Sequence, residues 1–488
     1  MSICSSSFSM QSPHYSSLTI EEKAQALFVN NEILAPMVRA STTPLRTLAL
    51  KYSTDVVYSE EIVDRSITGC DRRINHKLGT IDYVRKASCF SEKQLRKMRC
   101  QDSDELDLPV ILRIVPELER DKFVYQIGTG GPELALLAAQ MMERDVAAID
   151  INMGCPKKFS VSGGMGSALL LDTNRACEII KTLRRNINTV PISAKIRLLK
   201  DTQSTIDFVK SLEYAGVNAI TIHARAVGDD PTKPACWDRL EPVVSSLNVP
   251  TVVNGDMYTR EDITTLKELS GADSVMLARP ALYNTSIFRT RARRCQANDG
   301  ESETSKTGNS VDDASLLPKH QVIQEYLQEA IRWEANPQNV KYVICEMMSS
   351  RRTPINRVTS LPQYFPGNQA IGSVCACKTI PELCWLWDVN MSLGCKLTGS
   401  SNYGVTMSGS VTSDAIKVAA TEKTYDDSYF LEPETFRNKN SRIDDSSNVA
   451  CYSRKEKESS SNDDGCGVRG SCVAEDDELI TKKRVRVQ

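Results

Sequence analysis

A cysteine-containing loop follows one of the most apolar segments of this chain. The sequence Asp150-Ile-Asn-Met-Gly-Cys-Pro-Lys-Lys158 passes from an apolar run into the loop, and Gly163-Gly-Met-Gly166 follows shortly afterwards. A thiol placed just beyond a buried strand can donate a proton to a substrate or attack it. Glycines allow such a loop to approach closely and to move. We therefore single out Cys155 as the candidate catalytic residue, and we expect most of the 16 cysteines to be inert packing residues.

Polar side chains recur at the ends of other short apolar runs. The first run ends at Pro36-Met37, and later runs end at Glu60, Gln126, Asn152, Lys195, His223, Asn254-Gly255 and Arg279. Burying a polar group without a partner is costly, so each one needs a reason to be there. Any single case could be a satisfied core residue. Their recurrence at the same relative position indicates one shared pocket.

The residue types in this pocket suit a planar, electron-rich ring. A lysine (Lys195), an imidazole (His223) and two amides (Gln126 and Asn152) could surround such a ring. Lys195 beside the N1/O2 edge of a flavin would stabilise the anionic reduced form. The alternative for Lys195 is an ion pair with Asp150 or Glu60.

The last two runs carry a possible phosphate site. They end in Asn254-Gly255-Asp256 and Ala278-Arg279, and each leads into a helix-like segment. Barrel enzymes commonly bind phosphate in the loops after their seventh and eighth strands. Arg279 suits that role because its guanidinium is a forked donor.

The pattern of runs predicts the fold. Eight runs of strand length alternate for the most part with helix-length segments, which indicates a parallel sheet. Eight such units in about 260 residues match a closed (β/α)8 TIM barrel. An open, doubly wound sheet is the alternative, but the first run leads into Pro36-Met-Val-Arg-Ala40 without the glycine-rich phosphate loop of that fold. The runs are 33–35, 55–60, 123–128, 147–152, 191–197, 219–225, 250–255 and 274–279.

Composition divides the chain into five parts. We expect a disordered segment at 1–30, a TIM-barrel catalytic domain at 31–294, a flexible linker at 295–318, a small all-α helical domain at 319–392 and a disordered tail at 393–488. The linker and tail are rich in Ser, Asp, Lys and Glu and poor in large apolar side chains. The basic cluster at 482–486 is more simply a solvated terminus than a nuclear signal or an RNA contact.

Several classes of protein are disfavoured by composition. A net charge of −2 over 488 residues argues against a broadly basic nucleic-acid coat. Four scattered histidines disfavour a His-rich metal site, and Cys375, Cys377, Cys384 and Cys395 have irregular spacing for a metal knuckle, so we expect no metal. No apolar run approaches the ~20 residues of a membrane span, and a secretory signal is absent from the first twenty residues. The scattered cysteines are typical of reduced thiols in an intracellular protein.

Taken together, the motifs resemble one known family. The set Leu34-Ala-Pro-Met-Val38, Asp150–Lys157 with Gly163–Gly166, Lys195-Ile-Arg197, Ile222-His-Ala-Arg225, Asn254-Gly-Asp256 and Val275-Met-Leu-Ala-Arg279 is similar to the tRNA-dihydrouridine synthases. It resembles in particular the eukaryotic type that modifies uridine 20 of cytoplasmic tRNA. The resemblance covers residues 32–290 and continues more weakly through the helical segment. Six motifs in the right order are far more specific than any one alone.

The resemblance implies a flavoenzyme with bound FMN, reduced by NADPH, that reduces the C5=C6 bond of a flipped-out uridine. Hydride would pass to C6, and Cys155 would protonate C5. Asn152 and Arg225 would hold the uracil, and the helical segment would bind tRNA. The residues expected to surround FMN are Pro36, Met37, Gln126, Lys195, His223, Asn254, Gly255, Asp256, Ala278 and Arg279.

Some features depart from the family pattern. We find no C-terminal double-stranded-RNA-binding domain of the kind that some animal members carry. The segment 85–118 is longer than usual and basic at Lys93, Arg96, Lys97 and Arg99, and we interpret it as a surface elaboration. We expect a monomer in the cytoplasm, with the nucleus as a further location. The alternatives are an FMN barrel that acts on a free pyrimidine or enone, and an inactive RNA-binding scaffold.

Overall fold

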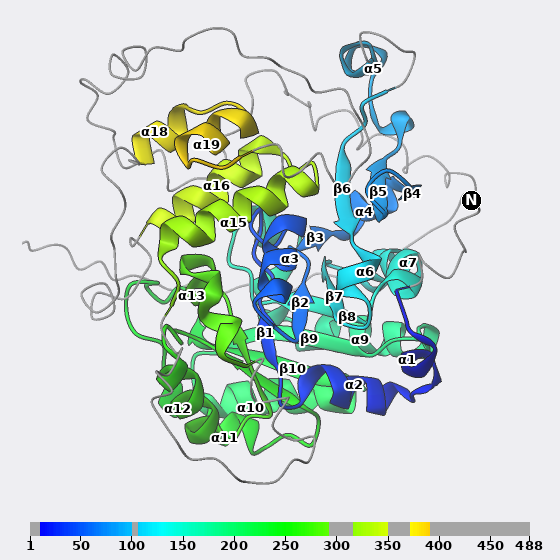
Figure 1. The fold of residues 1–488 in the computed structure, drawn as a ribbon. Helices are drawn as coiled ribbons and strands as arrows, with labels where there is room; N and C mark the ends of the chain where they lie inside the picture. The colour runs from blue at the N-terminus through cyan, green and yellow to red at the C-terminus, as the bar shows by residue number, and fades with distance from the viewer. Residues whose placement is uncertain (1–9, 100–105, 292–315, 350–370, 391–488) are drawn as a thin grey trace, which may run out of the picture. The chain divides into compact units, whose positions relative to one another are not determined.

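The computed structural model of the chain describes residues 10–99, 106–291, 316–349 and 371–390 (Figure 1). Most of the predicted linker and the whole predicted tail lie outside these residues, so both remain predictions. So do the basic cluster at 482–486 and Cys395.

Eight parallel strands form a closed barrel, as the sequence predicted. The first strand pairs with the second through Ile33 and Val56 and with the last through Ile33 and Met276, which closes the ring. Most of the strands are buried on both faces, which explains why they appear in the sequence as continuous apolar runs. In ring order the strands are β1 (Glu32–Leu34), β2 (Val56–Tyr58), β7 (Phe123–Gly128), β8 (Ala148–Met153), β9 (Ile192–Leu198), β10 (Ala219–Ala226), β11 (Thr251–Asn254) and β12 (Ser274–Leu277). A short strand, β3 (Ile62–Val63), extends the second position along β7.

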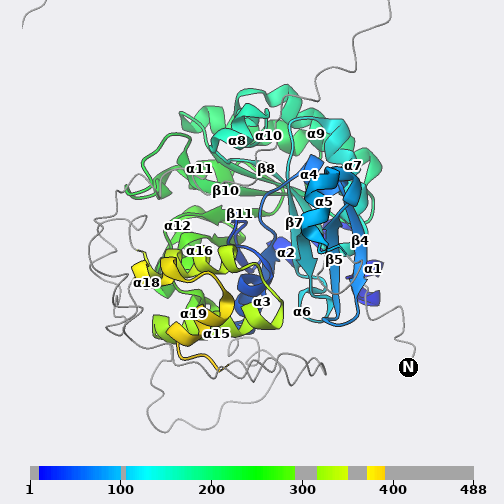
Figure 2. The same ribbon diagram turned by 90° about the horizontal axis from the view of Figure 1, so that it is seen from above.

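Helices surround the barrel, and Figure 2 shows α9 and α10 on the outer side of β8 and β10. In α9 an N-cap aspartate, Asp172, accepts from the backbone N–H of Arg175, and the apolar residues Ile179, Ile180 and Leu183 are buried. The helices of the barrel are α3 (Thr43–Lys51), α7 (Pro132–Met142), α8 (Lys158–Ser162), α9 (Thr173–Asn186), α10 (Thr202–Tyr214), α11 (Glu241–Val244), α12 (Arg260–Ser270) and α13 (Arg279–Tyr283).

The prediction of disorder over 1–30 was wrong for residues 10–30. Two helices, α1 (Pro13–Ser17) and α2 (Ile20–Phe28), pack on the N-terminal ends of the strands. The Tyr15 hydroxyl donates to the Ala147 carbonyl at 2.9 Å, and Phe28 is fully buried. The prediction relied on the serine-rich composition. The spacing of Thr19 and Glu22, which form a capping box at the start of α2, was the sequence signal for a helix.

A three-stranded antiparallel sheet lies between β3 and β7 of the barrel in sequence. It consists of β4 (Cys70–Asn75), β5 (Thr80–Arg85) and β6 (Val110–Ile114), and α4 (Asp64–Thr68), α5 (Glu92–Met98) and α6 (Pro116–Glu119) flank its strands along the chain. The predicted elaboration at 85–118 is therefore only the second half of this unit. The helix α5 carries the basic residues Lys93, Arg96 and Lys97 and buries none of its side chains.

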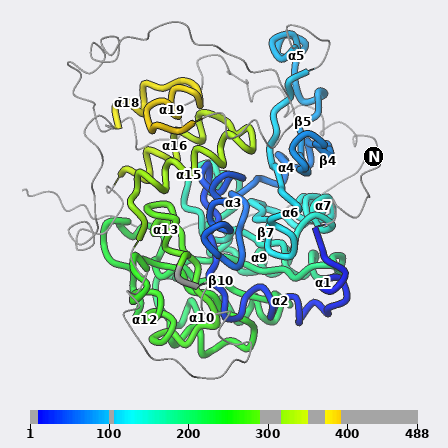
Figure 3. Tube along the Cα trace, in the orientation of Figure 1, coloured from blue at the N-terminus to red at the C-terminus, as the bar shows by residue number. Residues whose placement is uncertain are grey.

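Four helices follow the barrel in the described chain: α15 (Lys319–Arg332), α16 (Pro337–Met348), α18 (Ile371–Ala376) and α19 (Ile380–Leu386). Figure 3 shows α15 beside α3. At this contact the Thr47 hydroxyl donates to the Glu329 carboxylate at 2.7 Å, and the Trp333 indole N–H donates to the same carboxylate at 2.9 Å. The apolar core runs without interruption from the barrel into these helices, since Ile222 and Ile323 belong to one buried cluster.

Candidate active site

The strand register brings the predicted polar residues together at the C-terminal end of the barrel. Asn152 lies opposite Lys195, and His223 lies opposite Asn254, in neighbouring parallel strands. Pro36 and Met37 follow β1 and are half-buried, and Ala278 and Arg279 follow β12. Because carboxyl ends of parallel barrel strands meet at one mouth, these residues border a single site.

Two amides and a buried carboxylate form a hydrogen-bonded chain across the barrel. Asn152 Nδ2 donates to Gln126 Oε1 at 3.0 Å, and Gln126 Nε2 donates to Asp150 Oδ2 at 2.8 Å. Ser193 Oγ completes the chain by donating to Asp150 Oδ1 at 2.7 Å. Burial raises the pKa of Asp150 to about 6. These contacts fix the rotamers of Gln126 and Asn152 before any ligand arrives.

Asn152 also fixes the start of the cysteine loop. Its Oδ1 atom accepts the backbone N–H groups of Gly154 at 3.0 Å and Cys155 at 2.9 Å. Both ends of this amide are therefore engaged by the protein. The geometry supports a positioning role for Asn152 toward Cys155, and the predicted contact with uracil stays a prediction.

Lys195 is a half-buried cation without a carboxylate partner among the described residues. Its Nζ atom donates to Asn254 Oδ1 at 3.4 Å, while Asn254 Nδ2 donates to the Met276 carbonyl at 2.6 Å. Burial, followed by the charge of Arg197, lowers the pKa of Lys195 to about 8. The alternative ion pair of Lys195 with Asp150 or Glu60 is not formed in the structure. Asp150 accepts from Gln126 and Ser193 instead, and Glu60 accepts the Arg39 N–H.

His223 is held in its neutral form. Burial, and then the charges of Arg197, Lys195, Arg225 and Arg279, lower its pKa well below the ordinary value. A neutral imidazole is both a donor and an acceptor, so His223 can hydrogen-bond a ring edge without adding charge.

Asp256 holds two arginines at the mouth. Its carboxylate accepts Arg225 Nη2 at 2.5 Å, Arg279 Nη2 at 2.7 Å and the Ala235 N–H at 2.9 Å. We predicted Asp256 as a cofactor contact, but its acceptors are occupied by these donors, so the geometry favours a role in orienting the arginines. Arg225 keeps two buried donors, Nε and Nη1, without a partner among the described residues. Buried unpaired donors on a cation are costly, and an anionic ligand would satisfy them.

Gly255 has a backbone conformation that a side chain would strain. Its φ is 153°, and an added Cβ would lie 3.1 Å from the Cβ atoms of both Ala224 and Ala235. Its carbonyl accepts the Trp237 indole N–H at 3.0 Å. The glycine therefore allows close packing of the loop that delivers Asp256.

The loop bearing Cys155 packs closely against Gly166. The Ser167 N–H donates to the Cys155 carbonyl at 3.0 Å. Gly166 has φ of 59°, and an added Cβ would lie 2.6 Å from that same carbonyl. Burial and the Glu61 carboxylate raise the pKa of Cys155 to about 12. The thiol is therefore protonated at neutral pH, which favours proton donation over nucleophilic attack.

Two residues of this site escaped the sequence reasoning. Arg197 Nε donates to the Gly154 carbonyl at 2.7 Å, so it also supports the loop. Glu61 accepts from Ser160 Oγ at 3.0 Å beneath the loop. The sequence did contain signals for both residues. Arg197 is the second basic residue of Lys195-Ile-Arg197, and Glu61 is the second acid of the pair Glu60-Glu61 that follows a strand.

Within the described residues, no group of three or more His, Cys, Asp or Glu side chains could hold a metal ion. Cys375, one of the cysteines of the suggested metal knuckle, has its sulfur 3.8 Å from the sulfur of Cys345. Among the described residues, no third ligand joins this pair. None of the helices in the described parts of the chain has the length and apolarity needed to span a membrane.

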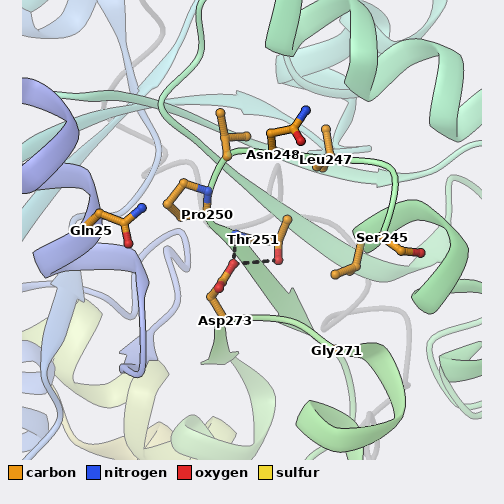
Figure 4. Close-up of a pocket in the computed structure, with 10 residues that line it drawn as sticks. Gln25, Ser245, Leu247, Asn248, Pro250, Thr251, Gly271 and Asp273 are labelled. Atoms are coloured by element: carbon orange, nitrogen blue, oxygen red, sulfur yellow. Dashed lines mark hydrogen bonds between the residues drawn. The ribbon is translucent and has the colours of Figure 1, made fainter.

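A hollow of about 290 Å³ lies elsewhere, among residues that include Gln25, Ser245 and Asn248 (Figure 4). Thr251, which begins β11, donates to Asp273 just before β12 through its N–H at 2.8 Å and its hydroxyl at 3.1 Å. The hollow is thus at the N-terminal end of the strands, opposite the candidate site.

Comparison with known proteins identifies the family of the chain. The profile of the dihydrouridine synthase (Dus) family matches residues 33–336. The tRNA-dihydrouridine(20) synthase (NAD(P)+) of Schizosaccharomyces pombe is 33% identical over 330 residues, which are 66% of this chain and 60% of that protein. The enzyme of the same name from Saccharomyces cerevisiae is 31% identical over 328 residues, which are 65% of this chain and 77% of that protein. The chain thus spans less than two thirds of the fission yeast relative. The profile match covers more than half of the chain, which therefore belongs to the dihydrouridine synthase family.

Proposed function

We propose that this chain is an FMN-dependent tRNA-dihydrouridine synthase that reduces a D-loop uridine, at position 20, with NADPH as the reductant. The observation that carries the proposal is the set of groups gathered at the barrel mouth: the buried unpaired donors of Arg225, the ammonium of Lys195 and the protonated thiol of Cys155. The two yeast relatives are named as tRNA-dihydrouridine(20) synthases (NAD(P)+), which supports the substrate and the reductant.

The residues present fit FMN. The unpaired donors of Arg225, together with Arg279, suit a phosphate, and the ammonium of Lys195 suits the electron-rich edge of a flavin ring. Asp256 would hold the two arginines in place. Pro36, Met37, Gln126, His223, Asn254, Gly255 and Ala278 would complete the surroundings of the cofactor.

When bound, reduced FMN supplies the hydride that adds to C6 of uracil. The protein supplies the proton: the S–H bond of Cys155 breaks as the C5–H bond forms. Asn152 and Arg197 hold the Cys155 loop through backbone contacts, and neutral His223 offers a hydrogen bond to a ring edge. The helices α15, α16, α18 and α19 would bind the tRNA body. We propose that the enzyme acts as a monomer in the cytoplasm, with the nucleus as a further location.

The test of this function compares tRNA with free uridine. We expect the flavin-loaded protein with NADPH to form dihydrouridine at position 20 of intact tRNA, measured by nucleoside mass spectrometry. A tRNA with cytidine at that position is the matched control and should gain none there. Equal reduction of free uridine would instead support the alternative of a small-molecule pyrimidine reductase. A colourless protein that never binds flavin would support the inactive scaffold.

Replacement of Arg279 by alanine tests the phosphate assignment. Loss of one charge-assisted contact of about 1.5–3 kcal/mol should weaken FMN binding by roughly 10–100-fold. The measurement is FMN titration of apoprotein by flavin fluorescence. Arg185→Ala on the exposed side of α9 is the control for charge and should bind FMN like the parent. Unchanged FMN affinity in Arg279→Ala would remove Arg279 from the phosphate site.

A further inference from the structure

Two thiols lie against each other in the helices that follow the barrel, and the function proposed above uses neither. Cys345 lies on α16 and Cys375 on α18, and their sulfur atoms are 3.8 Å apart. Both residues are free cysteines and both are half-buried. A small solute can therefore reach the pair. Two thiols in contact can be joined by oxidation, which a single thiol cannot undergo within one chain.

The packing of α16 on α18 holds the two thiols together. Ile344 and Val374, the residues just before the two cysteines, are fully buried in one apolar cluster. Lys341 lies one helical turn before Cys345, and its Nζ donates to the Cys375 carbonyl at 3.1 Å. The contact between the sulfur atoms is therefore set by an apolar core and by a hydrogen bond between the two helices.

The surroundings of the pair favour a thiolate at Cys375. The hydrogen bond from the Cys345 thiol lowers the pKa of Cys375, and the charge of Lys341 lowers it further, although burial acts against both. The thiolate is the form of cysteine that peroxides oxidise. The candidate catalytic thiol is in the opposite situation, because burial and the Glu61 carboxylate raise the pKa of Cys155. The pair is therefore a better target for an oxidant than Cys155.

We propose that Cys345 and Cys375 are a redox-active pair, which hydrogen peroxide converts to a disulfide between α16 and α18 while Cys155 stays reduced. The Cys375 sulfur attacks one peroxide oxygen, the O–O bond breaks and hydroxide leaves, which gives a sulfenic acid. The Cys345 sulfur then attacks the Cys375 sulfur, the S–O bond breaks and water leaves. In total the two thiols lose two electrons and two protons, and the peroxide becomes two molecules of water.

The disulfide would change the chain within the helices that the proposed function assigns to tRNA. The two cysteines are 30 positions apart in the sequence. A disulfide that closes such a loop restricts the unfolded chain, which stabilises the folded one. Oxidation should therefore raise the melting temperature, and reduction should reverse the change.

The test is peptide mapping after mild oxidation of the full-length, flavin-loaded protein. The protein is treated with hydrogen peroxide, blocked with N-ethylmaleimide in denaturant and digested without a reductant. We expect a linked pair of peptides that joins Cys345 to Cys375 and separates with dithiothreitol. Cys155 should carry the full label of N-ethylmaleimide in the same sample. The melting temperature of the oxidised protein should be higher than that of the reduced protein.

Cys377→Ser is the matched control, because this thiol lies two positions from the pair and donates to the Ser373 carbonyl at 3.3 Å. The control should form the cross-link like the parent, whereas Cys345→Ser should form none and lose the rise in melting temperature. Oxidation of Cys155 before the pair, a link between Cys375 and Cys377, or no cross-link in the parent would overturn the inference. None of these measurements uses tRNA, so the inference and the proposed function can fail separately.

Discussion

Replacement of Cys155 by alanine is expected to reduce dihydrouridine formation by about 10²–10⁴-fold, the usual contribution of a positioned general acid. The thiol is the group at the mouth whose raised pKa keeps it protonated at neutral pH. Asn152 Oδ1 accepts the backbone N–H of Cys155 at 2.9 Å, so loss of the Cys155 side chain should leave the loop in place. The measurement is single-turnover formation of dihydrouridine in tRNA by the prereduced enzyme.

Flavin content and flavin reduction by NADPH should remain unchanged in this variant, because neither uses the thiol. Cys177→Ala is the control for loss of a thiol, since Cys177 Sγ contacts the Ser211 carbonyl on the outside of the barrel. Undiminished turnover in Cys155→Ala would reject Cys155 as the proton donor.

Replacement of Lys195 by methionine is expected to slow flavin reduction by NADPH about 10²–10³-fold, as when one preorganised donor to a developing negative charge is removed. Methionine preserves most of the volume of the side chain and removes its charge. Lys195 has no ion pair among the described residues, so a partner carboxylate is not left unpaired. Stopped-flow absorbance of the flavin under anaerobic conditions measures the rate.

The pH dependence gives this prediction a second readout. The ammonium of Lys195 has a pKa lowered to about 8, so it is fully charged below that pH and loses its charge as the pH rises through it. FMN affinity of the apoprotein should therefore fall as the pH rises above 8, and this dependence should flatten in Lys195→Met. A parallel dependence in the variant and the parent would show that another group is responsible.

The sequence revealed the barrel because its strands are parallel and buried, which leaves a clear apolar signal. The hairpin of β4 and β5 was missed because β4, Cys-Asp-Arg-Arg-Ile-Asn, is largely exposed and polar. The α1 and α2 helices were missed because composition was given more weight than the capping residues Thr19 and Glu22.

The site was predictable to the extent that it depends on strand ends. Each residue expected there does lie at the barrel mouth or in the loops that follow its strands. Their partners were not predictable, because hydrogen-bond pairing depends on contacts across strands distant in sequence. The burial of Glu61, and the two arginine guanidinium groups that donate to Asp256, became visible only in the structure.

The closing of the barrel also has a consequence for synthesis on the ribosome. The backbone N–H of Asn31 bonds to Ser274 Oγ, 243 positions later in the chain, and Tyr15 bonds to Ala147. The ribosome synthesises α2 and β1 early, yet β12, which pairs with β1 and packs in the same apolar cluster as α2, is the last strand of the barrel to be synthesised. Non-local contacts of this kind fold slowly and leave apolar surface exposed in the meantime. The nascent chain must therefore carry an uncovered first strand through most of translation, which is the state that chaperones bind.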